Sequence, residues 1–366
     1  MVETLFEPWK DRILALKFRC LLLSDAKWLT ENANDPEAAK YAIDVFPVAS
    51  HEIEEWLKKD LEEKSSRYII AELEGEPAGF VRVSFRPEFR RDRHVAWLGI
   101  AVRRKYWRRG VGTGLMKEAI NLAKESGFRK LMLGTIEGNE RAIPLYEKFG
   151  FRTEAYEDEE VYIDGSWRKG FMMGLELAPC EPKLVSLARS QTPISSKKPS
   201  KTSKQRSLSV RQVMVSDSDE LHRLQNCPDS TKSTYRLPPI TKEETKKWLE
   251  KLRSEEGKYC FVCSRGKELL GYLQFRADRL PFPCLRFEEI LVDAKQELGE
   301  TAKSLVSAIK SFKERYWYRK IFAYVPEISR AVTEALEKQG FKKTGAMKDN
   351  YFTDGYYVNV AVYTFP

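Results

Sequence analysis

The chain has 366 residues, 42% hydrophobic and 32% charged, which suits two globular domains with a core each. No apolar run reaches 18 residues and charges interrupt the start of the chain, so the sequence predicts neither a membrane span nor a secretory signal peptide. Six cysteines are spread thinly, and Cys260 and Cys263 lie in a strand-like stretch without further ligands, which favours reduced thiols in a cytoplasmic protein over a zinc site or a redox pair.

The first half of the chain begins with a helix followed by a hairpin. Apolar residues at helical spacing predict an amphipathic helix at 52–63. Alternating residues predict strands at 67–73 and 78–85, joined by the turn EGEPA. This order of elements is typical of a mixed α/β domain.

Two apolar strands follow, separated by a glycine-rich turn and a helix that ends near residue 125. The strands are predicted at 94–102 and 130–136, and a right-handed crossover would make them parallel neighbours in the sheet. A short helix at 140–149 ends at Gly150, and a hairpin turns at Asp164–Gly165.

The glycine-rich turn, RRGVGTG at 108–114, opens the helix of this crossover. One glycine would satisfy a backbone that needs a positive φ. Three glycines at alternate positions favour close approach of a ligand to the N–H groups at the positive end of the helix. The sequence therefore predicts a phosphate site here, although the spacing matches neither a nucleotide P-loop nor the dinucleotide fingerprint.

This turn resembles motif A of the GNAT acyltransferase superfamily, with Arg109, Gly112 and Gly114 at the motif positions. Downstream, GNERAIPLYEKFGF at 138–151 resembles motif B of the same superfamily. Upstream, NDPEAAKY and EEWL resemble the RimJ/RimL-like branch, whose members modify protein N-termini or small amines. The resemblance covers residues 12–178 and implies an N-acetyltransferase with acetyl-CoA as co-substrate.

The resemblance also implies which residues hold acetyl-CoA. The diphosphate would lie on the N–H groups of the turn, the thioester carbonyl would meet backbone N–H groups of the preceding strand, and Asn139 would contact the cofactor arm. The implied cofactor-binding residues are Ile100, Ala101, Val102, Arg108, Arg109, Gly110, Val111, Gly112, Thr113, Gly114, Asn139 and Tyr146.

Catalysis would need a proton donor for the leaving thiolate and a route for the amine to lose a proton. Tyr146 is the expected general acid, against the alternative of an aromatic residue that packs on the sheet. Relatives carry a Glu in the strand before motif A, but that place holds Trp97 here. Glu137 and His94 are the candidate bases, directly or through water; deprotonation without a dedicated base is the alternative.

Residues 179–208 differ in composition from the rest of the chain. They hold seven Lys or Arg residues, one Glu, seven serines and four prolines, which predicts a basic linker. A solvated tether is favoured over a basic arm that touches nucleic acid or an acidic partner.

The second half repeats the first at a spacing near 190 residues, as in EEWLKKDL and KKWLEKLR, which indicates a tandem duplication. The glycine turn is not repeated, because only Gly299 remains in it, and Leu336 takes the place of Tyr146. The expected architecture is therefore two tandem GNAT-like α/β domains, each with a splayed parallel strand pair. They would be a catalytic domain at 1–178 and a degenerate copy at 209–366.

The leading hypothesis is acetyl transfer from acetyl-CoA to a primary amine in a ternary complex, without a metal. The acceptor would be a protein α-amine, a lysine, or a small amine or polyamine. The rival is a non-catalytic tandem module that senses acyl-CoA or binds protein or nucleic acid, the latter through the basic linker.

Overall fold

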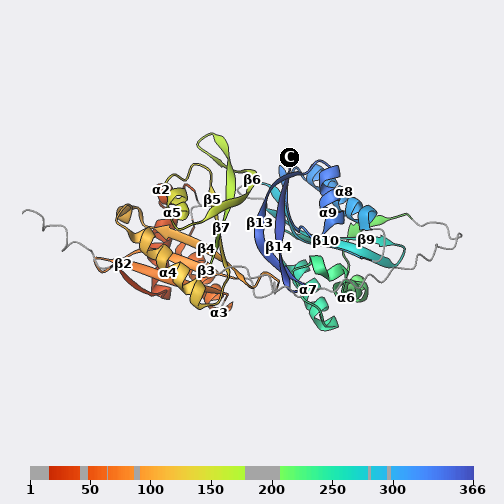
Figure 1. Cartoon of the computed structure of the whole chain (residues 1–366), viewed down its shortest axis with the longest axis horizontal. Helices are drawn as coiled ribbons and strands as arrows, with labels where there is room; N and C mark the ends of the chain where they lie inside the picture. The colour runs from red at the N-terminus through yellow and green to blue at the C-terminus, as the bar shows by residue number, and fades with distance from the viewer. Residues whose placement is uncertain are drawn as a thin grey trace, which may run out of the picture. The chain divides into compact units, whose positions relative to one another are not determined.

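The structure is a computed structural model, and it describes residues 16–41, 48–63, 65–85, 91–177, 207–278, 282–294 and 298–366. The chain forms two compact units (Figure 1). The first consists of residues 1–87 and 93–179, and the second of residues 88–92 and 180–366. Apart from residues 207 and 208, the expected linker falls outside the described residues.

Among the described residues, the sheet of the first unit has seven strands, and one neighbouring pair is parallel. This pair, β4 and β5, confirms the expected arrangement of the two apolar strands, and every other neighbouring pair is antiparallel. In sheet order, the strands are β1 (Lys17–Cys20), β2 (Ser66–Leu73), β3 (Glu76–Ser84), β4 (Val95–Val102), β5 (Lys130–Ile136), β7 (Ser166–Glu176) and β6 (Arg152–Ile163).

Helices cover both faces of this sheet. Alternation along β3 turns Val81 and Val83 toward one face, where they share a core with Leu115 and Ala119 of α4, while Phe80 packs on the other face with α1 and α3. In chain order the helices are η2 (Leu23–Asp25), α1 (Ala26–Ala33), α2 (Pro36–Ala39), α3 (Ser50–Glu63), η3 (Arg104–Tyr106), α4 (Val111–Glu125) and α5 (Ala142–Lys148).

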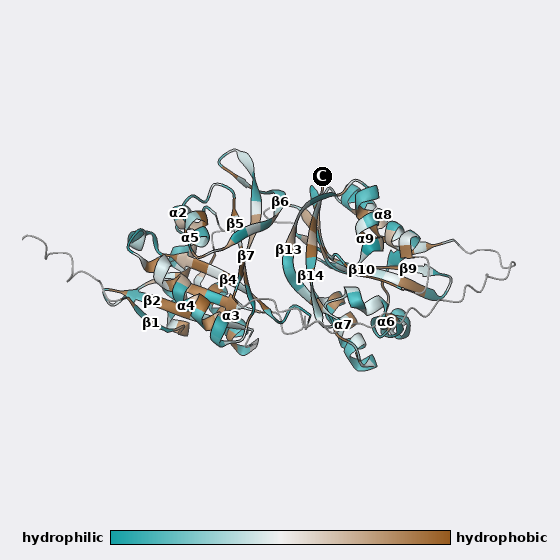
Figure 2. Ribbon diagram, in the orientation of Figure 1, coloured by the Kyte–Doolittle hydropathy of each residue, from teal (hydrophilic) through white to brown (hydrophobic). Residues whose placement is uncertain are grey.

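The second unit has the same order of strands. Its parallel pair is β11 and β12, and the apolar residues of its strands are coloured brown in Figure 2. In sheet order the strands are β8 (Ser209–Gln212), β9 (Lys258–Arg265), β10 (Glu268–Asp278), β11 (Cys284–Val292), β12 (Lys320–Pro326), β14 (Tyr356–Phe365) and β13 (Lys342–Thr353). The helices are η4 (Val215–Asp217), α6 (Ser218–Gln225), η5 (Ser230–Ser233), α7 (Lys242–Ser254), α8 (Leu298–Arg315) and α9 (Arg330–Lys338).

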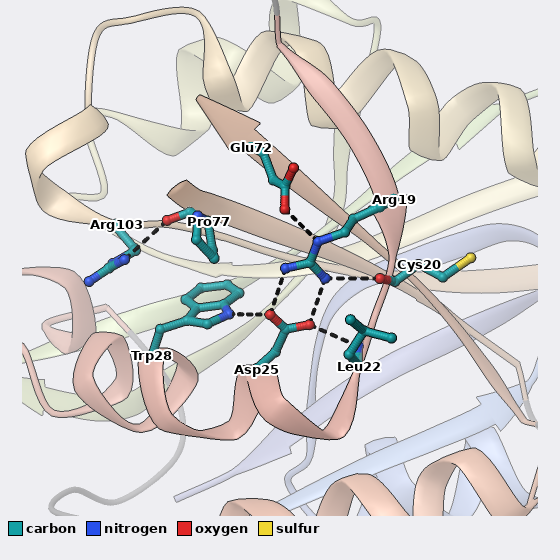
Figure 3. Close-up of polar contacts among 8 residues, drawn as sticks. All are labelled: Arg19, Cys20, Leu22, Asp25, Trp28, Glu72, Pro77 and Arg103. Atoms are coloured by element: carbon teal, nitrogen blue, oxygen red, sulfur yellow. Dashed lines mark hydrogen bonds and ion pairs between the residues drawn. The ribbon is translucent and has the colours of Figure 1, made fainter. Parts of the chain in front are cut away.

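A buried carboxylate fixes the start of α1 in the first unit (Figure 3). Both Asp25 oxygens accept from the Arg19 guanidinium at 2.8 Å, and they also accept the Leu22 N–H and the Trp28 indole N–H. Burial alone would raise the pKa of Asp25, but these hydrogen bonds hold it below its usual value. The Arg19 Nε donates to Glu72 at 2.6 Å, which ties β1 to β2.

The same arrangement recurs in the second unit. There, Arg211 donates to both oxygens of Asp217 at 2.7 Å, and the Met214 N–H donates to the same carboxylate. Across the described ranges, no helix has both the length and the apolar character needed to cross a bilayer.

Candidate functional site

The parallel strands β4 and β5 separate along their length. Only Val95, Ala96 and Trp97 pair with β5, whereas β4 stays paired with β3 as far as Val102. Both strands are fully described, and no pair between them follows Trp97. Residues Ile100, Ala101 and Val102 are half-buried although the start of β4 is buried. The end of β4 therefore presents backbone groups that a ligand can bind.

The turn from β4 to α4 contains a candidate anion site at the start of α4. Gly110 precedes the helix with φ 83°, and the first intrahelical bond runs from the Gly114 N–H to the Gly110 carbonyl at 2.9 Å. The N–H groups of Val111, Gly112 and Thr113 come before that bond, and no acceptor for them lies among the described residues. Three open N–H groups at the positive end of a 15-residue helix suit a phosphate.

The expectation that every residue of the turn offers an N–H group needs correction at Gly114, because its N–H is already bonded within α4. A Cβ at Gly114 would lie 3.0 Å from the Phe18 ring, and a Cβ at Gly112 would lie 3.2 Å from Leu145. Both glycines thus allow neighbouring side chains to pack closely on the start of α4. Of the three glycines in this turn, only Gly110 has a left-handed backbone and open space around it.

The two arginines of the turn differ in their surroundings. Arg109 forms an ion pair with Glu74 in the β2–β3 turn, and its guanidinium lies 5.5 Å from the Tyr106 ring centroid. Arg108 is exposed and has φ 59°. Of the two, only Arg108 lacks an ion-pair partner among the described residues, so the expected pairing of Arg109 with phosphate would require it to leave Glu74.

Tyr146 lies on α5, which follows β5. Its side chain is 6% exposed, and its ring lies 6.2 Å from that of Phe151. Burial raises the pKa of Tyr146 to about 12. The hydroxyl therefore stays protonated at neutral pH, which is the state that a general acid needs.

Asn139 begins α5. Its side-chain Oδ1 accepts the Ala142 N–H at 3.3 Å, and its Nδ2 donates to the Thr135 hydroxyl at 3.3 Å. These bonds fix the turn after β5, and a contact with the cofactor arm remains a prediction for this residue.

The two candidate bases lie at opposite ends of the parallel pair. Glu137 follows β5, at the end where the strands separate, but its Oε2 accepts the Lys169 N–H at 3.2 Å. His94 precedes β4, and its carbonyl accepts the N–H groups of Arg129 and Lys130. His94 and Ile100 are six positions apart along an extended strand, a distance of about 20 Å. The expectation that both residues flank one cleft therefore needs correction for His94.

The site includes two further residues, which the motifs did not indicate. The Trp107 indole N–H donates to the Val102 carbonyl at 2.8 Å, and the Arg141 guanidinium stacks over the Trp107 ring at 3.9 Å. An aromatic residue directly before the glycine turn was the available signal for Trp107. The position of Arg141 depends on where α5 packs, which local sequence does not specify.

A model of the Acetyltransferase (GNAT) family matches residues 31–151. The chain is 28% identical over 164 residues to the spermidine N(1)-acetyltransferase of Escherichia coli (strain K12), covering 43% of this chain and 84% of that protein. It is 26% identical over 120 residues to the L-amino acid N-acetyltransferase AaaT of the same strain, covering 32% and 73%. A GNAT-family acetyltransferase structure from Streptococcus pneumoniae matches with a TM-score of 0.40 and 29% identity, covering 45% and 100%.

Proposed function

We propose that residues 1–178 catalyse direct acetyl transfer from acetyl-CoA to a primary amine. The match of residues 31–151 to the Acetyltransferase (GNAT) family and the similarity to two N-acetyltransferases support this proposal. The observation that carries this mechanism is the open end of β4 beside the open start of α4. The first offers backbone groups to an extended ligand, and the second offers N–H groups to an anion.

Acetyl-CoA would use both features at once. Its diphosphate would accept from the N–H groups of Val111, Gly112 and Thr113. Its amide-bearing arm would lie along Ile100–Val102, where a backbone N–H would stabilise the developing oxyanion. Asn139 would approach the arm from the turn after β5.

The reaction would begin when a neutral amine attacks the thioester carbonyl. The new C–N bond forms, the C–S bond breaks, and the proton of Tyr146 passes to the departing thiolate. The attacking nitrogen releases one proton to water, and solvent returns a proton to Tyr146. An alkylammonium has a pKa of about 10.4, so the rate should rise with pH as more free amine becomes available. Glu137 is the better placed of the two candidate bases, through water.

The acceptor class is narrowed by the relatives, which are named for spermidine and for L-amino acids. We therefore place small amines first, polyamines above all, and keep protein α-amines and lysines as alternatives, as in the RimJ/RimL-like branch.

The features of the second unit support a tandem duplication in which the second copy, residues 209–366, does not catalyse. Residues 179–208 would link the two domains. The strand order and the Arg211–Asp217 pair of the second unit repeat those of the first unit. Strands β11 and β12 also pair over three residues only, but Ile290, Leu291 and Val292 are buried, and η5 packs on β11. Gly299 lies inside α8 rather than in the turn before it, which corrects the expected equivalence with the glycine turn.

Calorimetric titration with acetyl-CoA tests the proposal. Gly112→Glu places a carboxylate at the second residue of α4, in the path of the diphosphate, and should abolish binding. Gly299→Glu is the matched control, because Gly299 is the second residue of α8 and has open space around it. Absence of binding by the unaltered protein, or equal binding by Gly112→Glu, would contradict the mechanism.

A panel of polyamines, amino acids and peptides with labelled acetyl-CoA then identifies the acceptor. Binding of acetyl-CoA without transfer to any member would favour the rival, an acyl-CoA-sensing module.

A further inference from the structure

Ion pairs join helices α1 and α2 to the β4–α4 turn and to the start of α5 in the first unit. The β4–α4 turn contributes two arginines and the start of α5 contributes one, while the carboxylates come from α1 and from the start of α2. The nitrogen–oxygen separations are 3.2 Å for Arg103–Glu31, 3.9 Å for Arg104–Asp35 and 4.0 Å for Arg141–Glu37.

The pair formed by Arg103 is part of the scaffold. Its side chain is 19% exposed, donates to the Pro77 carbonyl at 3.1 Å and lies 5.9 Å from the Trp28 ring centroid. Figure 3 shows this arginine reaching toward Pro77 beside the Arg19–Asp25 cluster. Several contacts thus hold Arg103 in place.

The other two pairs are built differently. The side chains of Arg104 and Arg141 are 58% and 52% exposed, and each meets its carboxylate at the long end of ion-pair range. Asp35 is engaged elsewhere, because its Oδ1 caps α2 by accepting the N–H groups of Glu37 and Ala38. Exposed pairs of this kind contribute little to stability, so they can exchange partners.

Both exchangeable arginines are connected to the β4–α4 turn that holds the proposed diphosphate site. Arg104 belongs to η3, between β4 and α4. Arg141 stacks on Trp107, whose indole N–H holds the Val102 carbonyl at the end of β4. Guanidinium groups bind phosphate through paired hydrogen bonds, which a carboxylate at about 4 Å does not match.

We propose that Arg104 and Arg141 bind phosphate groups of acetyl-CoA, and that Asp35 and Glu37 occupy these arginines in the ligand-free protein as internal competitors. The inference rests on the proposed function and adds a regulatory feature to it. When acetyl-CoA binds, phosphate oxygens replace the two carboxylates as partners of the arginines. In the loaded protein, α2 is therefore no longer held by ion pairs to the β4–α4 turn and to α5.

The double variant Asp35→Asn/Glu37→Gln tests the competition. Asparagine caps a helix about as well as aspartate, so α2 should persist while both negative charges are lost. The Kd for acetyl-CoA should fall about three- to tenfold at low salt, because the arginines no longer have to leave a partner. At about 1 M salt, where charges are screened beyond about 3 Å, the gain should largely vanish.

Glu140→Gln is the matched control for a general field effect. Glu140 adjoins Arg141 and is exposed, but it forms no ion pair among the described residues. Its variant should leave the Kd within about twofold. An equal gain in Glu140→Gln would overturn the exchange, since any lost negative charge would then suffice.

A double-mutant cycle tests the arginines themselves. Arg104→Ala/Arg141→Ala should weaken acetyl-CoA binding about tenfold or more, and adding Asp35→Asn/Glu37→Gln to it should bring no further gain. A gain that persists without the arginines would overturn the proposal.

Inorganic pyrophosphate, titrated in parallel, separates this proposal from the proposed function. If acetyl-CoA binds no variant but pyrophosphate binds Asp35→Asn/Glu37→Gln more tightly than the unaltered protein, the exchange stands and the acetyl-CoA assignment falls. If neither ligand binds Asp35→Asn/Glu37→Gln more tightly than the unaltered protein, the proposed exchange is wrong.

Discussion

Tyr146 has an environment that sets its protonation state. Burial removes water from its hydroxyl and raises its pKa to about 12, so the phenol carries its proton throughout the physiological range. A thiolate that forms within reach would be the base that takes this proton. The same burial would be expected of a purely structural tyrosine, so kinetics must separate the two roles.

Tyr146→Phe keeps the packing and removes the proton donor. If Tyr146 is the general acid, kcat should fall about 100-fold while the Kd for acetyl-CoA stays nearly constant. Steady-state rates and calorimetric titration measure the two quantities. Tyr363→Phe, which alters a buried tyrosine of the second unit, is the control. An unchanged kcat in Tyr146→Phe would leave this tyrosine a packing role only.

Glu289 is a carboxylate buried in the second unit at β11. Its Oε2 accepts the Tyr272 hydroxyl at 2.8 Å. Burial raises the pKa of Glu289 above its usual value, although the nearby Arg236 and the Tyr272 hydrogen bond oppose the shift.

This raised pKa predicts how stability depends on pH. The folded state holds the proton of Glu289 more tightly than the unfolded chain, whose glutamate has a pKa of about 4.3. The resulting stability is fully present below that pH and is lost as the pH rises through the folded-state pKa. Glu289→Gln should remove this loss and raise the free energy of unfolding at pH 7, as measured by urea unfolding from pH 4 to 8. If Glu289→Gln were less stable than the unaltered protein at pH 7, this prediction would be contradicted.

At the scale of elements, two side chains hold the shape of the β4–α4 turn. Trp107 fixes the Val102 carbonyl, and Arg141 covers the indole ring. The turn therefore has a defined shape before any ligand arrives, which lowers the entropy cost of binding.

Trp107→Phe keeps an aromatic ring and removes the hydrogen bond to Val102. Loss of one such bond should weaken acetyl-CoA binding by roughly two- to tenfold, as measured by titration. Trp317→Phe is the control, because Trp317 is 87% exposed in the second unit. Equal affinity of Trp107→Phe and the control would show that the turn keeps its shape without the indole.

Much of the element order was predictable because periodicity is a local property. The helix expected at 52–63 is α3 (Ser50–Glu63), and the expected parallel pair is β4 with β5. The pairing of Arg109 with Glu74 was not predictable, because the two residues meet only through tertiary packing. The bonded N–H of Gly114 was missed for a different reason: where a helix begins determines which of its amides are open.

At the scale of the whole molecule, the two units share the same strand order but differ in burial at the end of one corresponding strand, β4 in the first unit and β11 in the second. Ile100–Val102 are half-buried, whereas Ile290, Leu291 and Val292 are buried. The fold is thus shared, while the open backbone that suits acetyl-CoA belongs to the first unit.

Differential scanning calorimetry should show this asymmetry. Acetyl-CoA at about 100 times its Kd should stabilise the unit that binds it by about 2.7 kcal/mol. For a unit of this size, that corresponds to a rise in Tm of about 5–10 °C. The transition assigned to the first unit should shift and the other should not, and equal shifts of both would contradict a silent second copy.

The separated strands also bear on turnover. The open end of β4 and the start of α4 would contact the arm and the diphosphate, which the spent coenzyme retains after the acetyl group has left. A site built on these shared parts would hold product nearly as well as substrate. Departure of the used coenzyme, rather than bond making, would then limit the speed of each cycle, and a cell's ratio of acylated to free coenzyme would govern the flux.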